Sequence, residues 1–352
     1  MNLKKLINNT PFLIRLFHWE YWPMSVVYFP LSVYYIWLAI KARSFFFFSA
    51  TNPSIESGGM MFESKWSIFK LIPKQYFPKT IFISEHNKFE ETLSALASSG
   101  IQYPFIAKPD RGERGWAIKK ISDQDSLREY LKICPVDFLI QEYIDYPVEL
   151  SVFYYRTTQE DKGVVSSVTL KELLCVKGNG RDTLEQLIRS NPRALLQLEN
   201  LAKSWSSQLN EVLSEGQVMQ LVPLGNHCRG ATFLDYNHVI DTRMTEVFDH
   251  ISRQIEGFYF GRFDLKCKSI EELKQGRSIA IVELNGSGAE PAHIYQPGYS
   301  FFKAQWHIFH HFNRMCEIGI RNKKNGAKFM SLSEFRELLR EQKKYKQKVN
   351  AT

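Results

Sequence analysis

The sequence predicts an α+β protein, in which short strands and amphipathic helices share one large core. Apolar runs of strand length, rich in β-branched and aromatic residues, occupy 258–265 and 279–284. Helical segments such as 89–98 separate runs of this kind, and an aromatic-rich helical segment lies within 1–50. With 352 residues, the chain is long enough for one compact enzyme of two or three lobes.

The charge and the cysteines narrow the class of protein. Lysine and arginine total 45 against 37 acids, a formal net charge of +8, which suits a nucleotide, an acidic substrate or an anionic lipid surface. No RNA-binding signature or DNA-recognition helix accompanies this charge, so we expect no nucleic-acid partner. The five cysteines are scattered and never form C-x-x-C, which favours a reducing compartment over a zinc or disulfide framework.

Residues 22–40 form a run of nineteen residues without a charge, flanked by basic residues on both sides. The length and the aromatic ends fit a membrane span. Pro30 lies in the middle, however, where it would break or kink a helix. A single span would also leave the preceding basic residues outside, against the positive-inside bias. Two interpretations therefore stay open: a kinked helix in the membrane interface, and a helix buried in a helical lobe.

Two lysines stand close to predicted strands in the next part of the chain. Lys65 precedes a short amphipathic turn, and from spacing alone it is more often a surface lysine. Lys108 follows the apolar run 105–107 and precedes Pro109, which prevents ladder pairing beyond it and so sets the end of a strand. Both lysines are candidates for a binding site, and Lys108 is fixed at a strand end.

A glycine turn follows Lys108. Gly112 and Gly115 flank Glu113 and Arg114, and the two glycines let the backbone turn sharply and present N–H groups to a phosphate. An isolated G-x-x-G is usually a plain hairpin turn, and no Walker A sequence G-K-[ST] is present. A phosphate-binding turn is favoured over a plain hairpin here, because a lysine precedes the turn and a second strand, 116–121, follows it.

A hinge separates two further predicted strands, 138–141 and 150–155. It contains Glu142, Tyr143 and Ile144, and Glu149 stands at the start of the second strand. Glu142 on its own is more often a solvated acid at a strand end. A strand that ends in a lysine, a glycine turn and this hinge follow one another in the chain. Together they indicate a binding site more specifically than any one of them does alone.

The following region offers one more candidate lysine. Lys171 comes shortly after the predicted strand 164–168, and Lys177 is its rival beside a Gly-Asn-Gly turn. Thr183 and Gln186 form a capping box for the helix 184–189. We prefer Lys171 over Lys177 as the candidate.

Oxygen ligands mark the ends of the two apolar runs named first. Asp264 lies in the first run and Glu283 in the second, and Asn285 shares a face with Glu283 because side chains alternate along a strand. With Arg262 beside them, these groups form a site for a hard cation, since Mg²⁺ takes one or two carboxylates and completes its octahedron with phosphate and water. Two edge-strand acids and an asparagine in a turn are an equally simple interpretation.

The motif GRFDLK at 261–266 followed by VELNGSGAEP at 282–291 resembles the metal-binding end of the ATP-grasp superfamily, in its D-alanine–D-alanine ligase and cyanophycin-synthetase-like branch. VKGNGRDTLEQLI at 176–188 is similar to the same branch. The resemblance covers about two thirds of the chain, 65–297. It implies an ATP-grasp fold, with two α+β lobes clasping ATP, preceded here by the aromatic helical segment in place of the family's amino-terminal α/β lobe.

The resemblance also implies roles for the residues at the nucleotide. Lysines and the glycine loop would neutralise the phosphates: Lys65, Lys108, Lys171 and Gly112-Glu113-Arg114-Gly115. The hinge Glu142-Tyr143-Ile144 would pair with the adenine edge, and Glu149 would accept the ribose hydroxyls.

At the metal end, the resemblance casts three residues as ligands of Mg²⁺ or Mn²⁺: Asp264, Glu283 and Asn285. Arg262 would stabilise the transferring phosphoryl group and the tetrahedral intermediate. The implied activity is an ADP-forming carboxylate–amine ligase that forms a C–N bond through an acyl phosphate. The alternatives are a kinase on the same scaffold and a non-catalytic ATP-binding scaffold protein.

The implied partners are a small-molecule carboxylate and an amine, and the aromatic amino-terminal segment suggests lipid-linked substrates among them. We expect a cytoplasmic protein, free or attached to the cytoplasmic face of the membrane. The expected divisions are a hydrophobic segment, a linker with an amino-terminal lobe, a nucleotide lobe, a catalytic lobe and a basic helix: 1–50, 51–103, 104–160, 161–325 and 326–352.

Two details concern the carboxyl-terminal part. His307 and His311 share one helical face, but without the glutamate of H-E-x-x-H we expect packing or surface histidines, not a zinc pair. Ser331 and Glu334 form a capping box for the last helix. The lysine-rich end of that helix, 343–348, is either solvated or in contact with anionic lipid.

Overall fold

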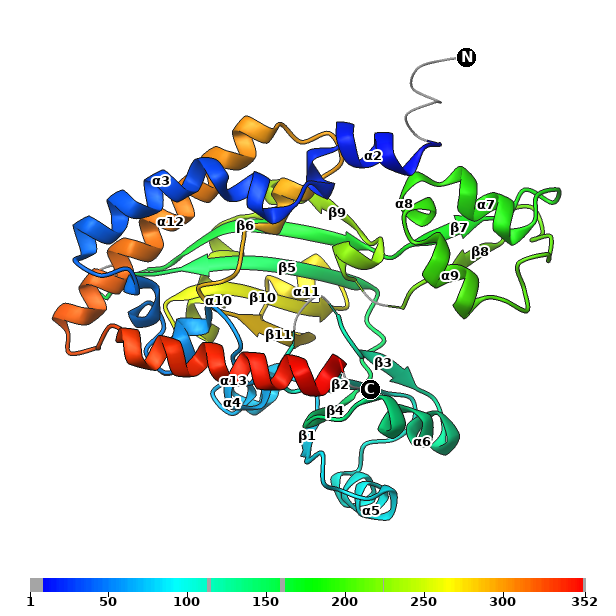
Figure 1. Ribbon diagram of the computed structural model, residues 1–352, viewed down its shortest axis with the longest axis horizontal. Helices are drawn as coiled ribbons and strands as arrows, with labels where there is room; N and C mark the ends of the chain where they lie inside the picture. Colours follow the sequence, from blue (N-terminus) through cyan, green and yellow to red (C-terminus); the bar gives the residue numbers. More distant parts are fainter. Residues whose placement is uncertain (1–8, 113–114, 159–161, 224, 351–352) are drawn as a thin grey trace.

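The computed structural model describes residues 9–112, 115–158, 162–223 and 225–350. Two antiparallel sheets form its body (Figure 1). The four-stranded sheet has the order β1-β4-β2-β3, and the five-stranded sheet has the order β11-β10-β5-β6-β9. The α+β class predicted from the sequence is therefore confirmed.

The strands are short, as the apolar runs predicted. The four-stranded sheet contains β1 (Thr80–Ile83), β2 (Phe105–Pro109), β3 (Lys119–Ile121) and β4 (Phe138–Glu142). The five-stranded sheet contains β5 (Val148–Tyr155), β6 (Val164–Glu172), β9 (Thr232–Asp235), β10 (Phe260–Cys267) and β11 (Ile279–Asn285). A separate pair, β7 (Cys175–Lys177) with β8 (Val218–Gln220), completes the set.

The helices surround these sheets. Up to residue 204, the chain contains α2 (Pro11–Phe17), α3 (Met24–Ala42), α4 (Lys65–Phe69), α5 (Phe89–Ser99), α6 (Gln124–Ile133), α7 (Leu184–Ser190), α8 (Pro192–Leu195) and α9 (Leu198–Ser204). The remainder contains α10 (Thr242–Arg253), α11 (Ile270–Leu273), α12 (Phe301–Lys324) and α13 (Leu332–Asn350).

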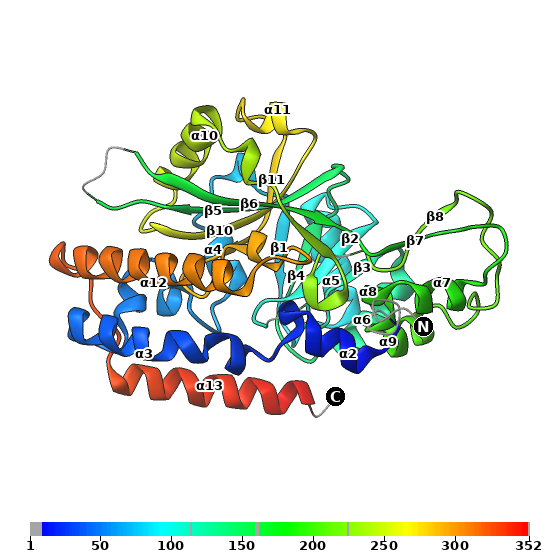
Figure 2. The ribbon, with the colours of Figure 1, turned by 90° about the horizontal axis from the view of Figure 1, so that it is seen from above.

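Alternation of side chains along β5 divides the core of the larger sheet into two layers. Val152 and Tyr154 point to the face covered by α10, where Phe248 is fully buried. Phe153 and Tyr155 point to the opposite face, where α12 and α3 pack. Figure 2 shows α10 and α12 on the two sides of this sheet. The sheet is therefore buried on both faces and can hold its strand ends rigidly.

The smaller sheet has its own core beneath α5 and α6. Leu96, Leu127 and Tyr130 pack there against Phe105 and Phe138. β5 already belongs to the larger sheet, so the change of sheet falls between β4 and β5, before the expected lobe boundary at 160.

Most local predictions are confirmed and a few are wrong. Thr183 with Gln186, and Ser331 with Glu334, make the predicted capping boxes. Pro30 does not break its helix, because α3 runs through it. Pro30 and Val26 both lie on the exposed side, where solvent can satisfy the carbonyl left without a donor. The strand predicted over 116–121 shortens to β3, since a turn precedes it.

The last helix, α13, returns along the body to the smaller sheet (Figure 1). Phe335, near its start, packs against Phe46 with 4.9 Å between ring centroids. Near its end, Tyr345 and Val349 pack against the core of the smaller sheet. α13 therefore connects the helical layer around α3 to the lobe that holds the glycine turn.

Candidate functional site

A cavity of about 600 Å³ is lined by residues from both sheets and from α13. This volume lies within the range of small-molecule sites. The lining includes, from the candidates named above, Lys65, Gly112, Gly115, Glu149, Lys171, Arg262, Asp264, Glu283 and Asn285. The cavity thus brings together segments that lie more than two hundred residues apart in the sequence.

Asp264 and Glu283 face each other across the ladder between β10 and β11. Arg262 pairs with Asn285 in the same register, two residues along each strand. Because side chains alternate, all four residues project from the same face of the sheet into the cavity. The prediction that Glu283 and Asn285 share a face is confirmed.

The Asp264 carboxylate is enclosed by cationic donors. Its Oδ1 and Oδ2 each lie 3.1 Å from a nitrogen of Arg262, and Lys171 Nζ lies 3.2 Å from Oδ1. The Ser151 hydroxyl also donates to Oδ1. Burial by itself would raise the pKa of Asp264, but Arg262 and Lys171 hold it well below its ordinary value. Asp264 is therefore ionised throughout the neutral range.

Lys108 is buried beside these acids. Its ammonium nitrogen lies 2.8 Å from Gln141 Oε1 and 2.8 Å from the carbonyl of Val282, the residue before Glu283. Burial lowers the pKa of Lys108 to about 7, although Glu283 opposes the shift. Lys108 is not among the described residues that line the cavity surface, and it lies directly behind Glu283.

Lys65, at the start of α4, contacts the glycine turn. Its Nζ donates to the carbonyl of Gly112 at 2.9 Å. Gly112 has φ 136° and Gly115 has φ 72°, so both positions favour glycine. Arg229 donates to the Gly115 carbonyl at 2.9 Å. Glu113 and Arg114 lie outside the described residues.

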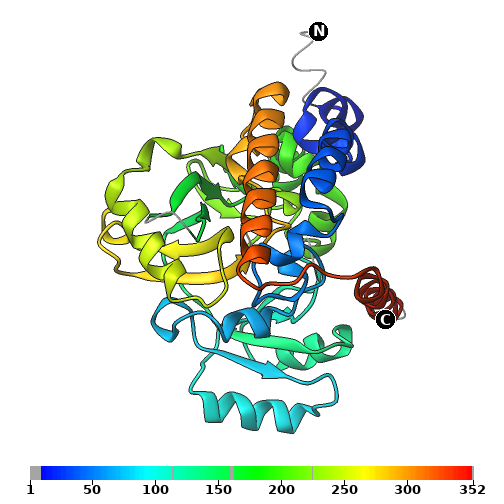
Figure 3. The same cartoon turned by 90° about the vertical axis from the view of Figure 1, so that its left-hand side faces the viewer.

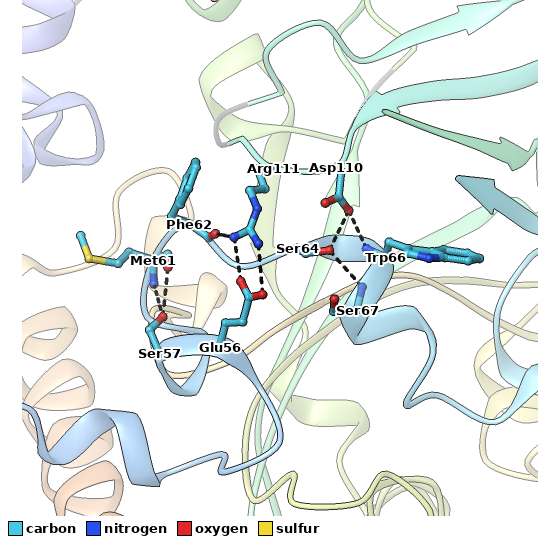
Figure 4. Close-up of polar contacts among 9 residues, drawn as sticks. All are labelled: Glu56, Ser57, Met61, Phe62, Ser64, Trp66, Ser67, Asp110 and Arg111. Atoms are coloured by element: carbon cyan, nitrogen blue, oxygen red, sulfur yellow. Dashed lines mark hydrogen bonds and ion pairs between the residues drawn. The ribbon is translucent and has the colours of Figure 1, made fainter. Parts of the chain in front are cut away.

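Two polar contacts join the start of the glycine turn to the segment before α4 (Figure 4). Arg111 forms a two-pronged ion pair with Glu56, at 2.7 and 3.0 Å. Asp110 accepts from the Ser64 hydroxyl at 3.0 Å and from the Trp66 backbone N–H at 2.7 Å. These contacts hold the base of the turn against the segment that carries Lys65.

The two rival lysines lie in different places. Lys171 is the penultimate residue of β6, with 7% of its side chain exposed, and also lies 3.8 Å from Glu149. Lys177 is exposed on β7 and is not among the described residues that line the cavity. The geometry therefore favours Lys171.

The hinge residues lie apart from the cavity lining as the structure describes it. The Glu142 carboxylate accepts from the backbone of Lys79 at 3.3 Å, and the carbonyl of Ile144 accepts from Lys266 at 3.1 Å. Lys120 lies 3.8 Å from the ring centroid of Tyr143. Only Glu149 of this group lines the cavity.

The loop before β9 and the loop after β11 form one end of the site. His227 lines the cavity, and burial lowers its pKa to about 4. After β11, the Tyr295 hydroxyl donates to Glu290, and burial raises the pKa of Glu290 to about 7. Arg262 donates to the Glu290 carbonyl at 3.3 Å, which connects this loop to the acids.

The helix α13 supplies a wall of the cavity that our sequence interpretation missed. Gln342, Tyr345, Lys346 and Val349 line it, and the Tyr345 hydroxyl donates to the carbonyl of Arg111. A pattern in the sequence could have indicated this wall. The less exposed residues of α13 recur at helical spacing and form one stripe: Phe335, Leu338, Gln342, Tyr345 and Val349. The sequence alone does not say which surface such a stripe covers.

The oxygen ligands fit a hard cation that takes few protein ligands. Within the described ranges, no group of three or more His, Cys, Asp and Glu side chains is placed to hold a metal. Asp264, Glu283 and Asn285 instead offer two carboxylates and an amide, the type of set that Mg²⁺ completes with phosphate and water. His307 and His311 contact Tyr299 and Ser166 through their rings, as expected for packing histidines.

Comparisons with known proteins give structural neighbours only. No protein-family profile matches the chain. No curated protein sequence matches it either. The fold is similar to that of the VanG D-Ala:D-Ser ligase of Enterococcus faecalis, at TM-score 0.42 and 15% identity over 75% of this chain and 62% of that one.

Two further solved structures are similar. A bifunctional glutathione synthetase from Pasteurella multocida has TM-score 0.38 and 16% identity, covering 72% of this chain and 35% of that one. The D-alanine–D-alanine ligase of Bacillus anthracis complexed with ATP has TM-score 0.43 and 13% identity, covering 77% and 70%. The chain thus spans less than two thirds of the VanG ligase and about a third of the synthetase.

Proposed function

We propose that this chain is an ATP-grasp enzyme, a carboxylate–amine ligase that forms ADP and phosphate. One observation carries the proposal: the cavity that receives the cross-strand acids Asp264 and Glu283 also receives Lys65, Lys171 and Arg262. Fixed cations facing paired carboxylates suit a nucleotide phosphate chain and its metal ion. The resemblance of GRFDLK and VELNGSGAEP to this superfamily supports the same conclusion.

The residues of the chain bind and orient the nucleotide. Lys65 and Lys171 neutralise phosphate charge, and Gly112 and Gly115, which both line the cavity, let the backbone approach a phosphate closely. Lys108 adds its charge from behind β11. Glu149, at the start of β5, accepts the ribose hydroxyls.

Mg²⁺ or Mn²⁺ would be held by Asp264, Glu283 and Asn285, and would neutralise the charge that develops on the γ-phosphate during transfer. Arg262 keeps Asp264 ionised and oriented, because it pairs with both carboxylate oxygens. The same guanidinium reaches the carbonyl of Glu290. It therefore lies between the proposed metal ligands and the loop after β11.

The reaction has two steps. A substrate carboxylate oxygen forms a bond to the γ-phosphorus while the bond from that phosphorus to the ADP oxygen breaks, which yields an acyl phosphate. The amine nitrogen then forms a bond to the acyl carbon, the carbon–oxygen bond to phosphate breaks, and the nitrogen loses a proton to solvent. Arg262 stabilises the negative charge in both steps, since it is positioned before reaction begins.

The test is turnover of ATP with a panel of carboxylic acids and amines. We expect ADP and phosphate, and a hydroxamate when hydroxylamine replaces the amine. Exchange of ¹⁸O between the bridging and non-bridging positions of the β,γ-linkage, with the acid alone, gives an independent readout of a reversible first step. A stable phosphorylated product would instead support a kinase, and ATP binding without turnover on any acceptor would support a scaffold.

A further inference from the structure

The helix α3 is apolar around its whole circumference, and the protein covers only one side of it. By length and composition it is long enough to cross a membrane, yet only 22% of its most apolar stretch is buried. The buried positions recur at helical spacing and form one stripe: Val27, Leu31, Leu38, Ala39 and Ala42. The apolar residues on the other sides of α3 are not covered by the described part of the protein, and they would be covered by a second partner.

The buried stripe of α3 packs along α12, and the two helices run in the same direction. Gln305 of α12 donates to the carbonyl of Val27 at 3.0 Å, and Cys316 lies 3.6 Å from the carbonyl of Leu38. Tyr34 and Phe309 pack between these contacts, with 4.7 Å between ring centroids. Figures 2 and 3 show the two helices side by side.

Away from the contact between the two helices, both expose large apolar side chains, and this exposed surface of the pair is apolar. We call it the apolar face and define it by Phe29, Val33, Ile40, Phe302 and Trp306, which each expose 70 to 83% of their surface. Phe302 and Trp306 of α12 adjoin Phe301 and Gln305, the residues that contact α3 and the segment before it. Phe12 and Phe17 of α2 are exposed as well. A soluble monomer rarely exposes so many large apolar side chains on neighbouring helices.

The helices that carry the apolar face are basic. Helices α2 and α3 contain no Asp or Glu. The one acid of α12, Glu317, forms an ion pair with Arg314. The exposed charged residues of these helices and of the turn after α3 are Arg15, Lys41, Arg43, Lys303, Lys323 and Lys324.

We propose that the apolar face docks on the surface of a membrane that contains anionic phospholipid. The aromatic and aliphatic side chains would enter the interface, and the basic residues would meet the lipid phosphates. Trp37 and Trp306, both exposed, are residues that favour the interface. The basic residues favour this partner over a second copy of the chain. In a symmetric contact, the basic residues of one copy would face those of the other and repel them.

The packing also argues against a membrane span, the topology that the length and the aromatic ends of 22–40 fit. If α3 crossed the bilayer, α12 would have to enter with it, because they pack together along their length. α12 carries His310, His311 and Arg314, which contact side chains of the larger sheet. Taking α12 into hydrocarbon would break those contacts. α3 therefore lies in the plane of the membrane surface.

The test is sedimentation of the full chain with phosphatidylcholine vesicles, with and without phosphatidylglycerol. We expect binding that requires the anionic lipid, weakens with salt and reverses on dilution. The variant Phe29→Gln/Ile40→Gln should lose binding about 100-fold, because two large apolar side chains no longer enter the interface. The variant Lys41→Gln/Lys324→Gln should lose about 25-fold on anionic vesicles only, about fivefold for each basic residue.

Matched controls change the same residue types elsewhere. Ile133 and Val218 are exposed apolar residues on other faces, so Ile133→Gln/Val218→Thr should bind like the wild type. Arg181→Gln/Lys203→Gln removes two exposed basic residues near α7 and α9 and should also bind like the wild type. All four variants change exposed side chains, so circular dichroism and thermal unfolding should match the wild type.

Four results would overturn the proposal. The first is a wild-type chain that stays in solution with anionic vesicles. The second is unchanged binding by Phe29→Gln/Ile40→Gln. The third is a dimer in light scattering that this variant dissociates, without vesicle binding, which would assign the apolar face to a second copy. Binding that resists dilution and an alkaline wash would replace surface docking with a span.

Discussion

Asp264 and Glu283 are paired directly across two antiparallel strands, but cations enclose only Asp264 on several sides. Arg262, Lys171 and Ser151 all contact the Asp264 carboxylate. Lys108 lies behind Glu283, in contact with the backbone of Val282. The two acids therefore differ in surroundings: Asp264 is held in a fixed position, and Glu283 is turned to the cavity with oxygen atoms available to a ligand.

Replacing Glu283 by glutamine should abolish ATP turnover and weaken Mn²⁺ binding in the presence of nucleotide. The change keeps the size of the side chain and removes the negative charge that a metal ion needs. Glu271→Gln, on the exposed surface of α11, is the matched control and should keep the wild-type rate. Steady-state ADP release and Mn²⁺ titration by electron paramagnetic resonance measure both effects. If Glu283→Gln keeps most of the wild-type rate, the metal assignment is wrong.

Lys171→Met should lower kcat/KM by about 100-fold or more, because a fixed cation next to the phosphates and Asp264 is lost. Arg262 still pairs with Asp264, so the variant should fold. Lys177→Met removes an exposed lysine of β7 and should leave the kinetics unchanged. Equal losses in the two variants would refute the choice of Lys171 as the phosphate-contacting residue.

Gly115→Ala and Gly276→Ala form a matched pair for the glycine turn. Both glycines have φ near +70°, so each substitution should cost about 1 kcal/mol of stability through backbone strain. Only at Gly115 would the new Cβ meet the site, 3.1 Å from the amide nitrogen of Asn226, whereas at Gly276 its nearest neighbour is 4.0 Å away. Gly115→Ala alone should therefore raise the Kd for ATP, measured by calorimetry. A similar rise for Gly276→Ala would show that general destabilisation explains the effect.

Tyr345→Phe should raise the KM for ATP about fivefold with little change in kcat. The hydroxyl donates to the Arg111 carbonyl at the base of the glycine turn, and losing one such hydrogen bond costs about 1 kcal/mol. Tyr259→Phe, in the core beneath α12, is the control and should leave KM unchanged. An unchanged KM in Tyr345→Phe would mean that α13 does not position the turn.

His311 should make the unfolding free energy depend on pH. Burial lowers its pKa to about 3, from 6.5, so the unfolded chain binds more protons between these values. Stability from this group is therefore complete above pH 6.5 and falls as the pH drops toward 3, by up to about 1.4 kcal/mol per pH unit. Urea unfolding at a series of pH values gives the unfolding free energy as a function of pH. For His311→Asn, this free energy should change less steeply with pH than for the wild type, by that amount.

The control for this slope is His86→Asn. The His86 side chain is 86% exposed, so its removal should leave the pH dependence as it is in the wild type. Other buried groups near His311 also contribute to the total slope, among them His293, whose pKa burial lowers to about 3. Only the difference between wild type and His311→Asn isolates one residue. If the unfolding free energies of wild type and His311→Asn change with pH in parallel, burial does not lower the pKa of His311.

The sequence by itself determined the local structure and the residues that we propose as metal ligands. Strand alternation placed Glu283 and Asn285 on one face, and the capping boxes at Thr183 and Ser331 set helix starts, because these features depend only on residues within a few positions. The motif around Asp264 carried the resemblance for the same reason: its residues are neighbours in the chain.

Only the tertiary structure decided which distant segments share the cavity. The stripe on α13 and the apolar residues of α3 were visible in the sequence, but a stripe does not specify its partner. Packing placed α13 against the glycine turn and left one side of α3 uncovered. It also chose Lys171 over Lys177, since that choice depends on the position of one side chain relative to Asp264, more than ninety residues later in the chain.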